Sequence, residues 1–170
     1  PDGGMSLRVA AASGAPLAAV GAGNRKDIRD AVEAAFKAEA WSRVSGHARA
    51  QVLYYIAENL SARAVEFAER IRAMTGASKP AARAEVEASI RRLFAYGAWA
   101  DKYDGAAHAV PLRGQALALP EPLGVVGVIA PEEAPLLGFI SLTAPLVAMG
   151  NRIVAVPSQA HPLSATDLYQ

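Results

Sequence analysis

The chain has 170 residues, enough for one domain with a sizeable core. Hydrophobic residues make up 52% of it and charged residues 19%, a composition typical of globular and not of disordered proteins. The net charge of +1 gives no strong attraction to nucleic acid or anionic membranes, and the lack of cysteine excludes a disulfide scaffold, a zinc–thiolate site and a thiol nucleophile within these residues.

Two features bear on location. The first residues lack a basic start followed by an apolar run, so we expect no signal peptide and a cytoplasmic protein. Ala134–Asn151 carries no charge, but prolines and glycines interrupt it and charged residues flank it closely. We therefore interpret this stretch as a buried helix followed by a turn, and not as a membrane span.

The first part of the chain, which holds most of the charged residues, predicts a hairpin and then helices. Residues 1–24 are expected to form a hairpin that turns at Ser13–Gly14. Residues 25–104 carry apolar residues at helical spacing, beginning after Asn24, a good helix cap. In the first helix the apolar face is predicted to consist of Ile28, Val32 and Phe36.

Three signals divide the helical region. The apolar stripe changes phase near Ser61, which predicts a break there. Gly76 is a good helix end, and Pro80 suits the first turn of a third helix that runs to about Tyr103. Asp104–Gly105 then predicts a turn.

The remainder of the chain changes to strand-like runs. Residues 105–120 are expected to be an extended connector. Leu123–Ala130 is a continuous apolar run that predicts a fully buried strand, and Arg152–Val156 predicts a second strand. Pro135–Met149 suits a helix between them, with a kink or break at Pro145. Residues 121–170 are therefore predicted to form a βαβ unit, the building block of a parallel sheet, and the fold class is α/β.

These elements in this order resemble the amino-terminal part of the aldehyde dehydrogenase superfamily. The resemblance covers essentially the whole chain, and its strongest segment is EPLGVVGVIAPEEAPLLGFISLTAPLVAMGNRIVAVPSQ, Glu121–Gln159. Ala40-Trp41-Ser42 and the helix ending Gly97-Ala98-Trp99-Ala100 are also similar to that family. The resemblance implies a Rossmann-like parallel sheet, of which this chain would form the first third of one domain.

The resemblance breaks at the turn after the first predicted strand. Active relatives have Trp-Asn-Phe-Pro where this chain has Glu132-Glu133-Ala134-Pro135. The resemblance implies that the family's Asn, which donates a hydrogen bond to the oxyanion, falls at Glu133. An ionised carboxylate cannot donate, and such a donor is worth roughly 10²–10³ in rate. The alternative interpretation is that both glutamates are ordinary helix-start acids, which complement the helix dipole.

It breaks again at the end of the second predicted strand. Relatives that bind a nicotinamide cofactor have Lys-Pro-Ser-Glu where this chain has Val156-Pro157-Ser158-Gln159. By the resemblance, the family's Lys bonds the adenosine ribose, a contact that Val156 cannot make. Losing such a charged hydrogen bond costs on the order of 1.5–3 kcal/mol. The resemblance thus makes Ile129, Pro131, Ser158 and Gln159 vestigial cofactor positions. The alternative interpretation is structural: Val156 would be a buried strand residue, and Ser158 would be a turn residue.

The histidines, His47, His108 and His161, are dispersed without metal-ligand spacing, so we expect no metal site. The pattern around Pro131–Ser158 is most similar to the non-catalytic carboxy-terminal domain of two-domain family-sixteen aldehyde dehydrogenases. This implies a pseudoenzyme domain with a structural or dimer-forming role. Its expected partners are the rest of its own polypeptide, an active dehydrogenase domain or a second copy. The segment would carry no cofactor, whereas the parent enzyme would use NAD.

Two other hypotheses stay open. The first is a divergent, active NAD(P)-dependent aldehyde dehydrogenase whose cysteine lies beyond this segment, with Glu133 as an acid or base. The second is an interaction module that presents its helices to a partner. A cut at Gln170 would leave the predicted sheet with an open edge, which is a liability for a free-standing domain.

Overall fold

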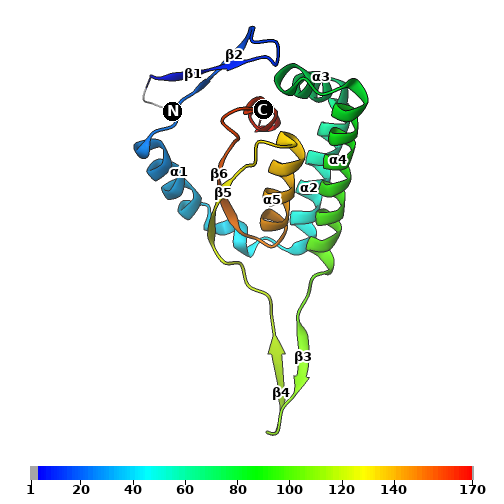
Figure 1. The fold of residues 1–170 in the computed structure, drawn as a ribbon. Helices are drawn as coiled ribbons and strands as arrows, with labels where there is room; N and C mark the ends of the chain where they lie inside the picture. Colours follow the sequence, from blue (N-terminus) through cyan, green and yellow to red (C-terminus); the bar gives the residue numbers. More distant parts are fainter. Residues whose placement is uncertain (1–3, 170) are drawn as a thin grey trace.

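The computed structural model describes residues 4–169 and shows a helical body beside a small parallel sheet, with one hairpin at each end (Figure 1). The amino-terminal hairpin pairs β1 (Ser6–Ala10) with β2 (Pro16–Gly21) in antiparallel register, with Gly14 in the left-handed conformation at its turn. Val9 of β1 packs with Met74 and Leu163, so this hairpin lies over the ends of two helices.

Helix α1 (Arg25–Lys37) begins where the sequence predicts. The Asn24 side chain accepts hydrogen bonds from the amides of Lys26 and Asp27, and the Asp27 carboxylate accepts one from the amide of Asn24. This reciprocal capping box satisfies the otherwise free amides of the first turn. The predicted apolar face of α1 exists, but none of its residues is buried. Its main neighbours are the strands β5 (Val125–Ile129) and β6 (Arg152–Val156) and a short 3₁₀ helix (Glu39–Arg43).

Three helices form the body: α2 (Gly46–Ala62), α3 (Ala64–Thr75) and α4 (Lys79–Lys102). The predicted break falls at Arg63, and Gly76 ends α3 in the left-handed conformation. Ser78 caps α4, which places Pro80 in its first turn as predicted. The main core consists of apolar side chains from these helices and from α5 (Pro135–Ala148), including Leu53, Leu60, Phe67, Ile71, Val86, Leu93, Leu136 and Ile140.

Residues 105–120 form a second hairpin and not only the extended connector that the sequence predicts. Strand β3 (Ala106–Ala109) pairs antiparallel with β4 (Gln115–Ala118), and every residue of both strands is exposed. The ribbon projects away from the body (Figure 1). Its alanine-rich strands have neither the β-branched residues nor the alternation of apolar and polar residues that indicate strands in a sequence. The sequence therefore does not predict β3.

The βαβ unit consists of β5 (Val125–Ile129), α5 (Pro135–Ala148) and β6 (Arg152–Val156), with β5 and β6 in parallel register. It is followed by the short helix α6 (Leu163–Tyr169). The mixed α/β fold class is therefore as predicted, but two details are wrong. Helix α5 continues through Pro145, so of the predicted kink or break the break is wrong. Strand β5 is not fully buried, because Val128 alone among its residues is buried. A two-stranded sheet has too few neighbours to cover both faces of β5.

No helix within residues 4–169 is long and apolar enough to cross a membrane.

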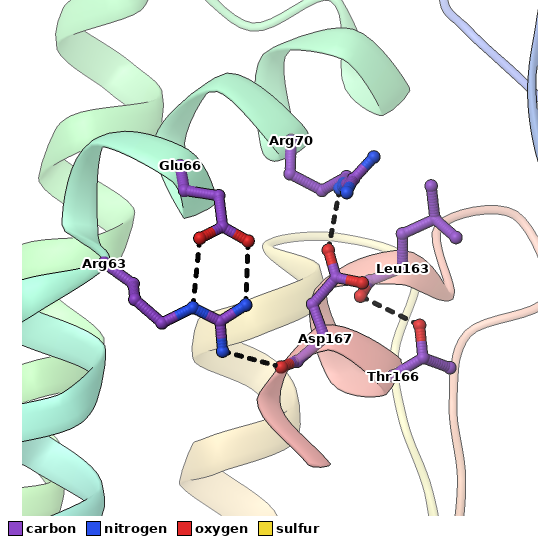
Figure 2. Close-up of polar contacts among 6 residues, drawn as sticks. All are labelled: Arg63, Glu66, Arg70, Leu163, Thr166 and Asp167. Carbon is purple, nitrogen blue, oxygen red and sulfur yellow. Dashed lines mark hydrogen bonds and ion pairs between the residues drawn. The ribbon is translucent and has the colours of Figure 1, made fainter. Parts of the chain in front are cut away.

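Helix α6 is fixed to α3 by a cluster of charged side chains (Figure 2). Arg70 donates to the Asp167 carboxylate at 2.7 Å, and Arg63 donates to the Asp167 carbonyl at 3.2 Å. Arg63 also holds the Glu66 carboxylate in a two-bond contact of 3.0 and 2.7 Å. The cluster therefore couples the last described helix to the helical body by directional bonds.

The Arg63–Glu66 pair predicts an acid-dependent loss of stability. The hydrogen bond from Arg63, followed by its charge, lowers the pKa of Glu66. Because the folded-state pKa lies below the unfolded one, the pair stabilises the fold above about pH 4.3 and stops doing so as the pH falls through the folded pKa. Denaturation of the Glu66→Gln variant should give a lower midpoint than wild type at pH 7, and the difference should close in acid. Glu58→Gln is the matched control, and a difference independent of pH would contradict the assignment.

The open sheet predicts the behaviour of the isolated chain. Leu123 and Ile129 are among several large apolar side chains exposed near the two-stranded sheet, and both sheet edges are unpaired among residues 4–169. Exposed edges and apolar patches promote association. A polypeptide of these 170 residues alone should aggregate or populate oligomers, as measured by light scattering during thermal melting. A monodisperse sample with a sharp, reversible transition would show the expectation to be wrong.

Candidate functional site

The carboxyl ends of the parallel strands bring two of the predicted site residues side by side. In the ladder, Ile129 at the end of β5 is the register partner of Val156 at the end of β6. The amide of Ala130 donates to the Val156 carbonyl at 2.9 Å, so the pairing extends beyond β5. The Ile129 side chain is 82% exposed and Val156 is 41% exposed. Ligands of parallel α/β sheets bind beyond this edge, and here it presents two aliphatic side chains.

The turn from β5 to α5 has a strained and closely packed backbone. Ala134 is the one non-glycine residue within residues 4–169 that has a positive φ, at 46°. The Gly138 amide donates to the Ala134 carbonyl at 2.7 Å. The ring of Pro131 lies against α5, where a Cβ added at Gly138 would be 2.5 Å from the Pro131 Cγ atom. Left-handed conformations of residues with a Cβ persist only where their surroundings impose them, and they concentrate at functional sites.

The two glutamates of this turn are exposed. The Glu132 carbonyl accepts a hydrogen bond from the Nδ1 atom of His161, at 3.0 Å. Because a carbonyl can only accept, this bond assigns the proton to Nδ1. The Glu133 carboxylate has neither a hydrogen bond nor an ion pair with any residue from 4 to 169. The turn therefore presents a free carboxylate at the position where the resemblance implies an oxyanion donor.

Glu132 and Glu133 lie just before the cap residue of α5, and a residue of α4 supplies the carboxylate that bonds the start of the helix. The Glu85 carboxylate accepts hydrogen bonds from the amides of Leu136 and Leu137, at 2.9 and 3.2 Å. Ala134, at the cap position, has no side chain that accepts one. Glu85 thus satisfies two free amides and complements the helix dipole from outside the helix. No local sequence signal announces a cap that lies 51 residues away.

The segment after β6 is shaped by Ser158. Its side chain is only 4% exposed, and its hydroxyl accepts a hydrogen bond from the His161 amide at 3.1 Å. Ser158 therefore closes a turn, in agreement with the structural interpretation of this residue. Gln159 is exposed on the same segment. With the bond from His161 to Glu132, the two loops that follow the strands are connected to each other.

The carboxyl end of α5 is held by the segment that carries the Ala40-Trp41-Ser42 motif. Trp41 Nε1 donates to the Val147 carbonyl at 3.3 Å, and Arg49 Nε donates to the Ala148 carbonyl at 2.8 Å. The Ser42 hydroxyl donates to the Gly150 carbonyl at 3.1 Å. Burial lowers the pKa of Arg49. The motif is therefore explained by structure: Trp41 donates to a carbonyl in the last turn of α5, and Ser42 donates to the carbonyl of Gly150 just beyond the helix.

A groove of about 660 Å³ lies at this end of α5, between Arg49, Tyr103 and Pro120–Leu123. It is at the opposite end of the sheet from Ile129 and Val156, since it borders the residues that precede β5 and follow α5. The groove is thus separate from the carboxyl edge of the sheet, where Ile129 and Val156 lie.

Comparison with known proteins identifies the family. The aldehyde dehydrogenase family model matches residues 5–170. The chain belongs to the aldehyde dehydrogenase family. It is 33% identical over 159 residues to the betaine aldehyde dehydrogenase of Bacillus subtilis, which covers 91% of this chain and 32% of that protein. It is 36% identical over 151 residues to aldehyde dehydrogenase 1 of Tanacetum cinerariifolium, covering 86% and 30%.

The backbone of the chain is also similar to that of a solved structure. The structure of PnpE in complex with nicotinamide adenine dinucleotide matches with a TM-score of 0.95 at 27% identity, covering 99% of this chain and 35% of PnpE. The chain thus spans about a third of the length of the relatives it matches. The described fold is a partial aldehyde dehydrogenase fold, and its backbone follows that of a relative solved with the cofactor.

The exposed side chains at the carboxyl edge are mostly apolar. A ribose needs hydrogen-bond donors and acceptors, but the exposed side chains of Ile129 and Val156 have none. The Ser158 hydroxyl is buried and already bonded, which leaves the Gln159 amide as the free polar group among the vestigial positions.

The Glu85 cap predicts a specific loss of stability. Replacing Glu85 by alanine removes the acceptor for the Leu136 and Leu137 amides, so the free energy of unfolding should fall by about 1–2 kcal/mol in denaturant titrations. Glu87→Ala is the matched control, because Glu87 lies exposed on the same helix in a surface pair with Arg83 and should change stability by less than about 0.5 kcal/mol. Equal effects of the two variants would contradict the role of Glu85.

Proposed function

We propose that this chain is the amino-terminal part of a non-catalytic aldehyde dehydrogenase domain with a structural role. The observation that carries the proposal is the state of the carboxyl edge, where Ile129 and Val156 meet without a polar group and Glu133 stands as a free carboxylate. An ionised carboxylate opposes a developing oxyanion, so this turn works against acyl chemistry. Because these residues include no cysteine, they also supply no thiol nucleophile.

The structural role that we propose is to assemble with the rest of the polypeptide, with an active dehydrogenase domain, or with a second copy in a homodimer. Two exposed features support it. The β3–β4 ribbon is exposed along its whole length and leaves unpaired strand edges, which are ready to pair with another chain. The apolar residues of α1 and of β5 remain partly uncovered, which suits them to contact further protein.

In this proposal the parent protein is an NAD-dependent aldehyde dehydrogenase through another domain, and its compartment is the cytoplasm. The similarity of the edge to the second domain of the two-domain family-sixteen enzymes supports this arrangement. So does the retention of the backbone of a relative that binds nicotinamide adenine dinucleotide.

The alternative function is a divergent, active enzyme. It is favoured by the backbone of the turn, because the left-handed conformation of Ala134 is of the strained kind that concentrates at functional sites. In this case a cysteine outside these residues would be the nucleophile, and Glu133 would act as an acid or base. The sequence that surrounds this chain in its gene discriminates between the two: a cysteine in the family's nucleophile context within the same domain supports the alternative.

An activity assay tests the proposal. In the full-length polypeptide, the catalytic cysteine of any other dehydrogenase domain is replaced by serine, and reduction of NAD is followed with a set of aldehydes. We expect no turnover above the uncatalysed rate, because neither an oxyanion donor nor a cofactor contact is present at this edge. Aldehyde-dependent reduction of NAD that falls when Glu133 is changed to alanine would establish the alternative instead.

A further inference from the structure

A groove of about 450 Å³ lies away from the carboxyl edge, between α2 and α4, which are neighbours in the helical body (Figure 1). It is lined by three aromatic side chains, one amide and one carboxylate: Tyr54, Tyr55, Phe94, Gln51 and Glu58. We infer that this groove binds an arginine side chain presented by a segment of another protein. The inference goes beyond the proposed function, because it does not depend on whether the carboxyl edge is catalytic.

The aromatic surface of the groove begins with Tyr54, whose ring is held by packing. Gly97 of α4 is buried, and a Cβ atom added there would be 2.6 Å from the Cε1 atom of Tyr54. The Tyr54 ring therefore lies directly against α4, in a place that only glycine leaves open. The ring also packs against the main core. A ring that is already ordered loses little conformational freedom when a ligand stacks on it.

Phe94 continues this aromatic surface from one helix to the other. Its ring centroid lies 5.8 Å from that of Tyr54, with 31° between the ring planes. Phe94 is 40% exposed and Tyr55 is 67% exposed, so the groove presents aromatic surface to solvent. The faces of aromatic rings carry partial negative charge and attract cations, arginine more often than lysine.

Glu58 supplies a full negative charge beside these rings. It follows Tyr55 by three residues and Tyr54 by four on α2, which places the three side chains on one face of the helix. Glu58 is exposed, and its carboxylate has neither a hydrogen bond nor an ion pair with any residue from 4 to 169. The carboxylate is therefore available to a cation from outside. Three other exposed glutamates of the helical body are each paired with an arginine: Glu66, Glu69 and Glu87.

Arginine suits this combination of rings and carboxylate. Its guanidinium group is planar, so its face can stack on a ring while its edge donates two hydrogen bonds to a carboxylate. The ammonium group of lysine is a compact, strongly hydrated charge without a face that stacks. Val52 lies one turn before Tyr55 on α2 and is 41% exposed, so it offers apolar contact to the residues that flank the arginine. This contact favours a protein segment over a free organic cation.

The test is saturation-transfer NMR of the full-length polypeptide with the tripeptide N-acetyl-Leu-Arg-Leu-amide. The same tripeptide with citrulline is the matched probe, because citrulline is neutral and has nearly the shape of arginine. We expect the arginine peptide to bind roughly five- to thirty-fold more tightly, since citrulline loses both the attraction to the rings and the ion pair with Glu58. The peptide with lysine should bind more weakly than the arginine peptide, and methylguanidinium alone should bind more weakly still.

Variants of the groove identify the contacts. Glu58→Gln should weaken binding of the arginine peptide roughly two- to fivefold and leave binding of the citrulline peptide unchanged. Phe94→Leu should weaken binding of the arginine peptide to a similar degree, whereas Phe94→Tyr keeps the ring and should bind as wild type does. Two changes on α1, Glu33→Gln and Phe36→Leu, remove an exposed acid and an exposed ring outside the groove and should have no effect.

The inference fails if the arginine peptide does not bind, if it binds no more tightly than the citrulline peptide, or if folded Glu58→Gln and Phe94→Leu variants bind it as wild type does. Equal binding of the lysine peptide would overturn the assignment of arginine. Methylguanidinium that binds as tightly as the peptide would overturn the assignment of a protein segment. None of these results changes the outcome of the activity assay, so a failure of the inference is distinct from a failure of the proposed function.

Discussion

The helix α5 carries backbone groups at both ends that its own residues leave free, and the rest of the structure depends on how they are satisfied. At its start, Glu85 of α4 accepts from two amides. At its end, Trp41 and Arg49 donate to the last carbonyls, and Gly150 turns the chain away in a left-handed conformation. A mostly apolar helix that is held in this way fixes both the helical body and the strands on either side of it. The turn after β5 and the edge at Val156 are placed by these contacts.

This constraint explains how a site can lose its chemistry while its framework remains. The contacts that fix the edge come from Glu85, from the packing of Pro131 on Gly138, and from the His161 and Ser158 bonds. None of them depends on the identity of the side chains at 133 or 156. Substitutions at those two positions change what the edge can bind and leave the fold in place. The non-catalytic domain that we propose is the expected product of such a separation.

The sequence was informative where local chemistry decides the structure. The Asn24 capping box, the end of α3 at Gly76 and the start of α4 before Pro80 follow from short-range hydrogen bonds and backbone preferences, and each lies where it was predicted. The sequence was uninformative where distant residues decide it. The Glu85 cap joins residues 51 apart, and the exposure of Ile129 depends on how many strands the sheet has. The roles of Glu133 and Val156 came from resemblance, and the structure adds their surroundings.

A crystal structure of the full-length protein grown in millimolar NAD would decide whether this edge binds the cofactor, because it shows the framework and the ligand in one measurement. The account predicts that Ala134 keeps its left-handed conformation, that Glu85 keeps its bonds to the start of α5, and that no nucleotide density lies over Ile129 and Val156. An ordered adenosine ribose beside Val156 and Gln159 in the wild-type protein would contradict the account, since it would show that this edge still binds the cofactor with the side chains it has.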